Sequence, residues 1–141
     1  MLQPFIPPDL DADTEPFWRG CAEGRLVIAR CRVCGLYLHP PRPACRRCRS
    51  MDIERVEVSG RGVVYSFTLA YHAFIPSLEV PYVIAIVELA EQPGLRMMTN
   101  IVGCDPHTVR IGMAVRATFA VFAGVDGIAA PHFVPDGDVA A

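Results

Sequence analysis

The chain has 141 residues, of which 52% are hydrophobic and 20% charged, and its formal net charge at pH 7 is −2. This composition suffices for one folded domain with a small appendage, and it excludes a wholly disordered chain. No apolar run approaches the ~20 residues of a membrane-spanning helix. The N-terminus lacks the basic and apolar segments of a signal peptide, so we expect a cytoplasmic protein whose thiols stay reduced.

The N-terminal part predicts an extended arm followed by a short helix. Residues 1–13 are rich in proline and aspartate, and Thr14 can cap a helix that begins after it. Phe17, Trp18 and Cys21 would share one apolar side of this helix. Because the N-terminal part has little core of its own, we expect the helix to pack against another surface, such as a partner chain.

Two cysteine pairs follow, Cys31 with Cys34 and Cys45 with Cys48, in the pattern C-x2-C-x10-C-x2-C. Four thiolates form the tetrahedral set that structural zinc prefers, and they leave no open position for substrate. Iron is an alternative ion, because the C-x-x-C-G turn also resembles rubredoxin, although rubredoxins space their pairs further apart. Two disulfides are another interpretation, but they need an oxidising compartment. We therefore predict a structural zinc site.

The charge is unevenly distributed. All 13 basic residues are arginines, and seven of them lie between Glu23 and Asp52, where no acidic residue occurs. With four thiolates and a divalent ion, this segment would carry about +5. It either pairs with the acidic N-terminal arm or forms a surface that binds anions or a partner.

The rest of the chain is β-rich. Strands are expected at residues 26–29 and 36–39, and then at 63–71, 82–89, 95–102 and 115–122. In the strand 63–71, alternation places Val63, Tyr65, Phe67 and Leu69 on the core face. A short helical turn starts at Asp105. Strands of this number and spacing indicate a small closed barrel.

Several motifs occur in order from Phe17 to Pro135. They are Phe17-Trp18, Gly24-Arg25-Leu26, Cys31-Arg32-Val33-Cys34-Gly35, Pro40-Pro41-Arg42, Cys45-Arg46-Arg47-Cys48, Gly60-Arg61-Gly62-Val63-Val64-Tyr65-Ser66, Pro81-Tyr82-Val83, Gly112-Met113-Ala114-Val115 and Phe133-Val134-Pro135. Together they resemble the acyl-CoA-associated OB-fold zinc-ribbon family, long catalogued as a domain of unknown function.

The resemblance implies an all-β fold with a short N-terminal helix, in which a rubredoxin-like zinc ribbon precedes a five-stranded OB-fold barrel. The expected boundaries are an arm and helix at 1–24, the zinc ribbon at 25–55, the OB-fold barrel at 56–135 and a tail at 136–141.

The resemblance also implies an accessory subunit that is not catalytic on its own. Family members accompany thiolase-fold enzymes, such as ketothiolases and sterol side-chain aldolases, or hotdog-fold enoyl-CoA hydratases. We therefore expect a scaffold role in acyl-CoA metabolism, such as lipid or steroid degradation. Arginine binds phosphates well, and the loop before residue 82 is apolar. The residues expected to contact CoA or a partner are Arg61, Phe74, Pro76, Pro81, Tyr82 and Arg96.

Two other functions fit parts of the sequence. Cys104 and His107 could form a nucleophilic pair, but the sequence shows no third group that would orient them. A nucleic-acid-binding OB-fold and zinc-ribbon module is the second alternative. It requires exposed aromatic platforms beside a positive groove, whereas alternation places Tyr65 and Phe67 on the core face. The sequence pI of about 6.0 also disfavours nucleic-acid binding.

Overall fold

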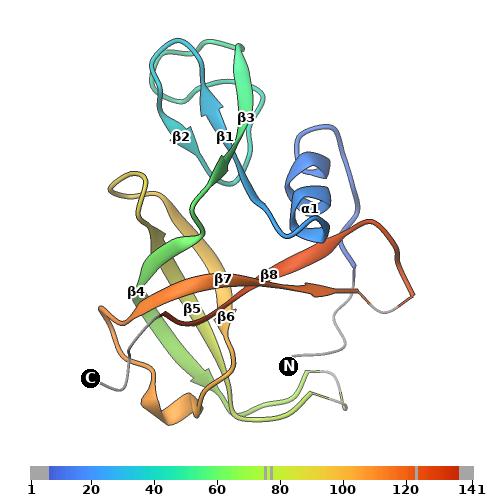
Figure 1. Cartoon of the computed structure of the whole chain (residues 1–141), viewed down its shortest axis with the longest axis vertical. Coiled ribbons are helices and arrows are strands. Elements are labelled where there is room, and N and C mark those ends of the chain that lie inside the picture. Colours follow the sequence, from blue (N-terminus) through green and yellow to red (C-terminus); the bar gives the residue numbers. More distant parts are fainter. Residues whose placement is uncertain (1–6, 75, 77, 123, 137–141) are drawn as a thin grey trace.

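The computed structural model describes residues 7–74, 76, 78–122 and 124–136. A small three-stranded sheet lies above a closed five-stranded barrel, and one helix lies at their side (Figure 1). This arrangement confirms the predicted fold class. Within the described ranges, no helix is long and apolar enough to cross a bilayer.

The ribbon sheet is antiparallel, in the order β2-β1-β3. Its strands are β1 (Leu26–Cys31), β2 (Tyr37–Leu38) and β3 (Ile53–Val58). Strand β3 pairs with the whole of β1 and crosses the predicted boundary between residues 55 and 56. It was not assigned from the sequence, because the charged residues Glu54, Arg55 and Glu57 interrupt its apolar alternation.

The barrel strands are ordered β4-β5-β6-β8-β7. They are β4 (Arg61–Ala70), β5 (Tyr82–Leu89), β6 (Arg96–Ile101), β7 (Ala114–Val121) and β8 (Ala129–Pro135), with the 3-10 turn η1 (Pro106–Thr108) before β7. Strand β8 closes the barrel by pairing with β7 and, in parallel, with β6 at Ile101↔Phe133. No strand was assigned there from the sequence, since two of its seven residues are prolines, which are depleted in strands.

Helix α1 (Glu15–Ala22) packs against another surface, as expected, and the surface described here belongs to its own chain. It lies against β8 and β1, and Phe17 and Cys21 are buried there. That surface comes from β8, which was not assigned from the sequence, and from β1, with a smaller part from β7. Thr14 does occupy the N-cap position, but its side chain makes no capping hydrogen bond.

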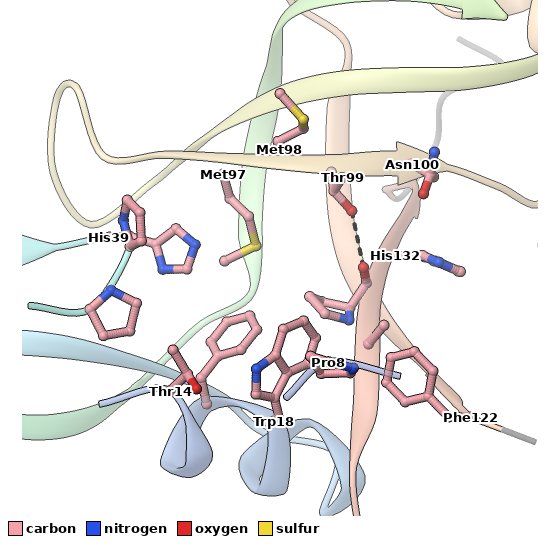
Figure 2. Close-up of a pocket in the computed structure, with 15 residues that line it drawn as sticks. Pro8, Thr14, Trp18, His39, Met97, Met98, Thr99, Asn100, Phe122 and His132 are labelled. Atoms are coloured by element: carbon pink, nitrogen blue, oxygen red, sulfur yellow. Dashed lines mark hydrogen bonds between the residues drawn. The ribbon is translucent and has the colours of Figure 1, made fainter. Parts of the chain in front are cut away.

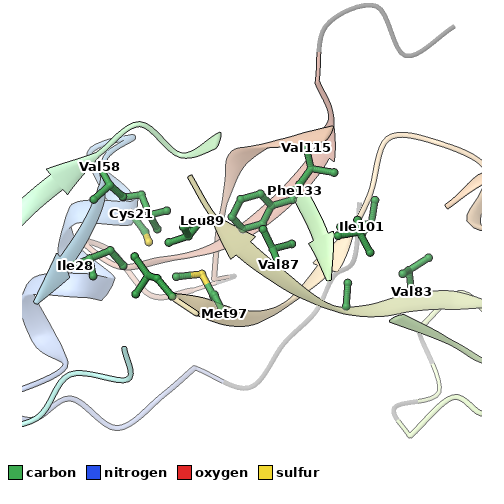
Figure 3. Packing of buried hydrophobic residues seen from close by; sticks show 14 of the residues in the cluster. Cys21, Ile28, Val58, Val83, Val87, Leu89, Met97, Ile101, Val115 and Phe133 are labelled. Carbon is green, nitrogen blue, oxygen red and sulfur yellow. The ribbon is translucent and has the colours of Figure 1, made fainter. Parts of the chain in front are cut away.

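One apolar cluster runs from the helix and the base of the ribbon into the barrel (Figure 3). Cys21 enters it from α1, Ile28 and Val58 enter it from the ribbon, and Phe133 is fully buried inside the barrel. Burying a large aliphatic or aromatic side chain contributes about 1.5–3 kcal/mol. The shared cluster therefore couples the ribbon to the barrel.

A β-bulge in β4 changes which residues face the core. Pairing with β5 passes from Val64↔Val87 directly to Ser66↔Ile86, so Tyr65 is an extra residue. Val64 is therefore buried, whereas Val63 and Tyr65 are 42% and 46% exposed. The prediction that Val63 and Tyr65 face the core was wrong. An extra residue reverses the alternation, and Phe67 then packs against the core.

The ribbon is also hydrogen-bonded to the barrel through Gln92, in the loop between β5 and β6. The Gln92 Oε1 accepts the Tyr37 N–H at 2.9 Å, and its Nε2 donates to the Tyr37 carbonyl at 3.3 Å. The Gln92 side-chain amide thus forms the pair of hydrogen bonds with the backbone of β2 that a neighbouring strand would form. A single polar residue in a turn gave no sequence signal for this role.

We expect Gln92→Ala to lower the free energy of unfolding by about 1–2 kcal/mol, because two hydrogen bonds to Tyr37 are lost. Chemical denaturation measures this change, and amide hydrogen exchange at Tyr37 should become faster. Pro93→Ala, at the exposed neighbouring position, serves as the control. It should leave the free energy of unfolding and the Tyr37 amide exchange close to those of the wild type. Unchanged Tyr37 exchange in Gln92→Ala would contradict the assignment.

Candidate metal centre

The two cysteine turns have the same backbone design. In the first, the Gly35 N–H donates to the Cys31 carbonyl at 2.9 Å, and in the second the Arg49 N–H donates to the Cys45 carbonyl at 2.9 Å. Gly35 and Arg49 both have left-handed backbones, with φ of 78° and 67°. This conformation closes each turn. It suits glycine but strains arginine.

The turns bring four sulfur atoms together. The Sγ atoms of Cys31, Cys34, Cys45 and Cys48 all lie within 4.8 Å of one another. The Cys31–Cys48 and Cys34–Cys45 pairs of sulfurs are separated by 3.5 Å and 3.6 Å. A tetrahedron with metal–sulfur bonds of about 2.3 Å has sulfur–sulfur edges of about 3.8 Å. The residues present therefore fit a tetrahedral ion held by four thiolates.

Backbone amides favour the thiolate form of two of these cysteines. A hydrogen bond from the Leu36 amide lowers the pKa of Cys34 to about 6, and the Cys48 amide lowers the pKa of Cys45. The Arg47 guanidinium donates to the Cys34 carbonyl at 2.8 Å. Since metals bind the thiolate, these contacts prepare the site for an ion.

Two of the ribbon arginines pair with acids that precede β1 or lie in or beside β3. Arg32 lies 3.2 Å from Asp52, and Arg25 bonds to Glu23 at 2.6 Å. Across the described residues, the acids of the arm form no ion pair with the ribbon arginines; Arg55 instead donates to the Asp13 carbonyl. Among the same residues, the arginines whose side chains make no ion pair or hydrogen bond in the ribbon are Arg42, Arg46 and Arg49. This exposed group keeps the positive charge available.

The six residues expected to contact CoA or a partner fall into two separate groups. Arg61 and Arg96 lie at the end of the β4–β5 hairpin nearer the ribbon, where Arg61 pairs with Asp136 and Arg96 pairs with Glu88. The other four lie at or beside the opposite end, in or next to the β4–β5 loop: Phe74, Pro76, Pro81 and Tyr82. The length of β5 separates the groups by about 20 Å. They do not form one site.

Arg96 also covers an aromatic ring. Its guanidinium carbon lies 3.7 Å from the centroid of the Tyr65 ring, which the bulge directs outward.

Within the second group, Phe74 is 74% exposed and its ring contacts His72, whereas Tyr82 is buried against Leu78. Tyr82 therefore supports the loop rather than presenting a free surface.

The Cys104 and His107 pair is not assembled as a nucleophile. His107 Nδ1 lies 3.2 Å from Asp105 Oδ1, and His107 Nε2 lies 3.3 Å from the Tyr71 hydroxyl. Cys104 packs against the barrel core and makes no hydrogen bond in the described part of the chain. The third group that the sequence did not reveal, Asp105, is present. It orients the exposed histidine, but no hydrogen bond joins the histidine to the thiol among the described residues.

We expect Gly35→Ala to weaken metal retention by the ribbon, because alanine costs about 1–2 kcal/mol in a left-handed backbone. An added Cβ would meet only ordinary contacts, the nearest with Arg30 Nη2 at 3.5 Å, so the effect isolates backbone strain. Arg49→Gly should strengthen metal retention, because glycine relieves the strain of the left-handed backbone at that position. Competition with a chromogenic chelator measures both variants. Equal affinities of Gly35→Ala and wild type would contradict the strain argument.

Comparisons with known proteins agree with this architecture. Residues 18–54 match the family described as "ChsH2, rubredoxin-like zinc ribbon domain", and residues 55–120 match "ChsH2, C-terminal OB-fold domain". Over 108 residues, the chain is 44% identical to a "Probable enoyl-CoA hydratase alpha subunit" of Thermomonospora curvata, covering 77% of this chain and 33% of the relative.

Two further relatives carry related names. The "3-oxo-4,17-pregnadiene-20-carboxyl-CoA hydratase alpha subunit" of Mycobacterium tuberculosis is 44% identical over 82% of this chain and 36% of its own length. The chain thus spans about a third of both hydratase subunits. A "DUF35 domain-containing scaffold protein" of Methanocaldococcus jannaschii is 40% identical over 72% of this chain and 73% of its own length.

The structure is also similar to a chain of the solved "Ltp2-ChsH2(DUF35) aldolase". The TM-score is 0.81 at 39% identity, and the match covers 92% of this chain and 98% of the other. The chain therefore belongs to the ChsH2/DUF35 family, whose members join a rubredoxin-like zinc ribbon to an OB-fold domain.

Proposed function

We propose that this chain is a non-catalytic scaffold subunit that binds a thiolase-fold enzyme, such as a ketothiolase or a sterol side-chain aldolase, or a hotdog-fold enoyl-CoA hydratase. In this role it assists acyl-CoA metabolism, including lipid or steroid degradation, in the cytoplasm. The observation that carries the proposal is the structural similarity to a chain of the "Ltp2-ChsH2(DUF35) aldolase", which covers 98% of that chain.

The chemistry of the site supports a structural role. Four thiolates complete a tetrahedral set, so a bound ion would have no open position for water or substrate. We assign zinc as that ion, because the ligands are four thiolates in a short-spaced ribbon; a set of four sulfurs also accepts iron. A bound ion contributes folding free energy to the loops that carry its ligands.

Contact with the CoA thioester is a further part of the proposal. Arg61 and Arg96 supply guanidinium groups at one end of the β4–β5 hairpin, and Phe74 and Pro76 supply exposed apolar surface at the other. Guanidinium groups bind phosphates, and exposed aromatic and arginine side chains are enriched in protein interfaces. The separation of the two groups favours a partner that contacts both ends of the barrel.

A nucleic-acid-binding module remains the alternative. The outward position of Tyr65 favours it, since one aromatic ring is exposed where the sequence predicted none. One face of that ring is covered by Arg96, however, and Phe67 packs against the core. Binding of single strands needs several free rings on one face, and the exposed rings of Tyr71 and Phe74 lie at the opposite end of the β4–β5 hairpin. This alternative predicts salt-sensitive binding to oligonucleotides.

We expect Cys31→Ser to lose the metal and the enzyme partner together. Removing a ligand atom should weaken metal binding by more than the factor of about 10–100 that is typical when a supporting contact is lost. The ribbon loops would then unfold, because the ion stabilises them. Elemental analysis of the purified variant measures the metal, and co-purification from the native host measures the partner.

Cys104→Ser is the matched control, because Cys104 is a half-buried thiol outside the cluster. It should keep both metal and partner. Retention of metal and enzyme by Cys31→Ser would sink the proposed role of the ribbon, and salt-sensitive oligonucleotide binding by the wild type would support the alternative.

A further inference from the structure

A pocket lies where the helix, the ribbon loop and the barrel meet (Figure 2). Its volume is about 380 Å³, within the range of ligand sites. An apolar cavity of about 150 Å³ already binds benzene. A single aromatic side chain of a partner would therefore leave more than half of this pocket empty, whereas a compound of two or three fused rings would fill it.

The walls are mainly apolar and come from all three parts of the molecule. Trp18 belongs to the helix, Pro41 belongs to the ribbon loop, and Met97 and Phe122 belong to or adjoin barrel strands. The Trp18 and Phe122 rings are 6.1 Å apart between centroids and meet edge to face. Such walls favour a flat hydrophobic ring system.

Two of the polar side chains in the walls are already engaged. Thr99 Oγ1 donates to the Pro131 carbonyl at 3.0 Å, and Asn100 Nδ2 donates to the Val83 carbonyl at 2.8 Å. The Thr99 hydroxyl hydrogen is thus already used, and the Asn100 amide is held in place by the barrel backbone. His132 lies toward the end of the pocket where Phe122 is found, away from His39 (Figure 2).

His39 is different, because its ring is directed into the pocket on the side of Met97 (Figure 2). Its Nδ1 is buried without a hydrogen-bond partner. Its outer nitrogen, Nε2, makes no hydrogen bond with any described residue either. Burial lowers the pKa of His39 to about 4, so the ring is neutral at pH 7.

A neutral imidazole either donates or accepts at Nε2, depending on its tautomer. A hydroxyl group can do both, so it matches either tautomer. A carboxylate would instead favour an imidazolium, which the apolar walls oppose. The chemistry of His39 therefore selects a neutral hydroxyl over an acid.

We propose that this pocket binds a compact, flat, apolar ring compound with one hydroxyl group, which hydrogen-bonds to His39 Nε2. The inference does not depend on the partner enzyme, because the pocket is formed by this chain alone.

The test uses 2-naphthol as the probe and naphthalene as the matched compound without a hydroxyl. Binding is followed by naphthalene fluorescence and by NMR shifts of the Trp18 indole N–H and of the His39 ring nitrogens. We expect saturable one-to-one binding of 2-naphthol, with naphthalene about threefold to tenfold weaker because one hydrogen bond is missing. His39→Phe should bind both compounds equally.

Ala130→Phe, in the pocket wall, should block 2-naphthol, whereas Ala114→Phe, exposed elsewhere on the barrel, should not. Failure of 2-naphthol to bind saturably would overturn the proposal. So would equal affinity of the wild type for the two compounds, or unchanged binding in Ala130→Phe. If Ala130→Phe does not fold, the comparison of the two compounds in wild type and His39→Phe still decides the outcome.

Discussion

One apolar cluster joins helix α1, the base of the ribbon and the barrel, and the placement of every other feature depends on it. Ile28 and Val58 enter it from the ribbon, and Leu89 and Met97 enter it from the barrel. The two hydrogen bonds between the Gln92 side chain and the Tyr37 backbone add a polar connection beside it. The ribbon is therefore held in one orientation on the barrel. Such preorganisation lowers the entropic cost of binding a partner, which is what a scaffold requires.

The cysteine site stabilises the outer part of the ribbon, which lies outside the apolar cluster. The outer part of the ribbon has only a small core of its own, formed by Ala29, Cys31, Leu36, Leu38 and Cys45. A core of this size cannot order the long loop between β2 and β3 by apolar burial alone. Four sulfur atoms arranged for one ion supply the missing constraint, and they leave the exposed arginines on a fixed surface.

The metal pattern was predictable from the sequence because ligand type and spacing are local, and both turns close within a few residues. Strands with alternating apolar residues were also predictable. The exposure of Tyr65 was not, because a one-residue bulge reverses the faces of a strand without a signal in composition. That α1 packs on a surface was predictable, but its contacts with β8 were not, because the prolines of β8 conceal a strand. Gln92 and His39 acquire their roles only through contacts that are distant in sequence.

Affinity purification of the tagged chain from its native host, with quantitative mass spectrometry of what accompanies it, tests the central claim most directly. The account predicts a thiolase-fold enzyme or an enoyl-CoA hydratase at near-equal molar amount. Recovery of nucleic acid that dissociates as salt rises, or of no enzyme at all, would contradict it.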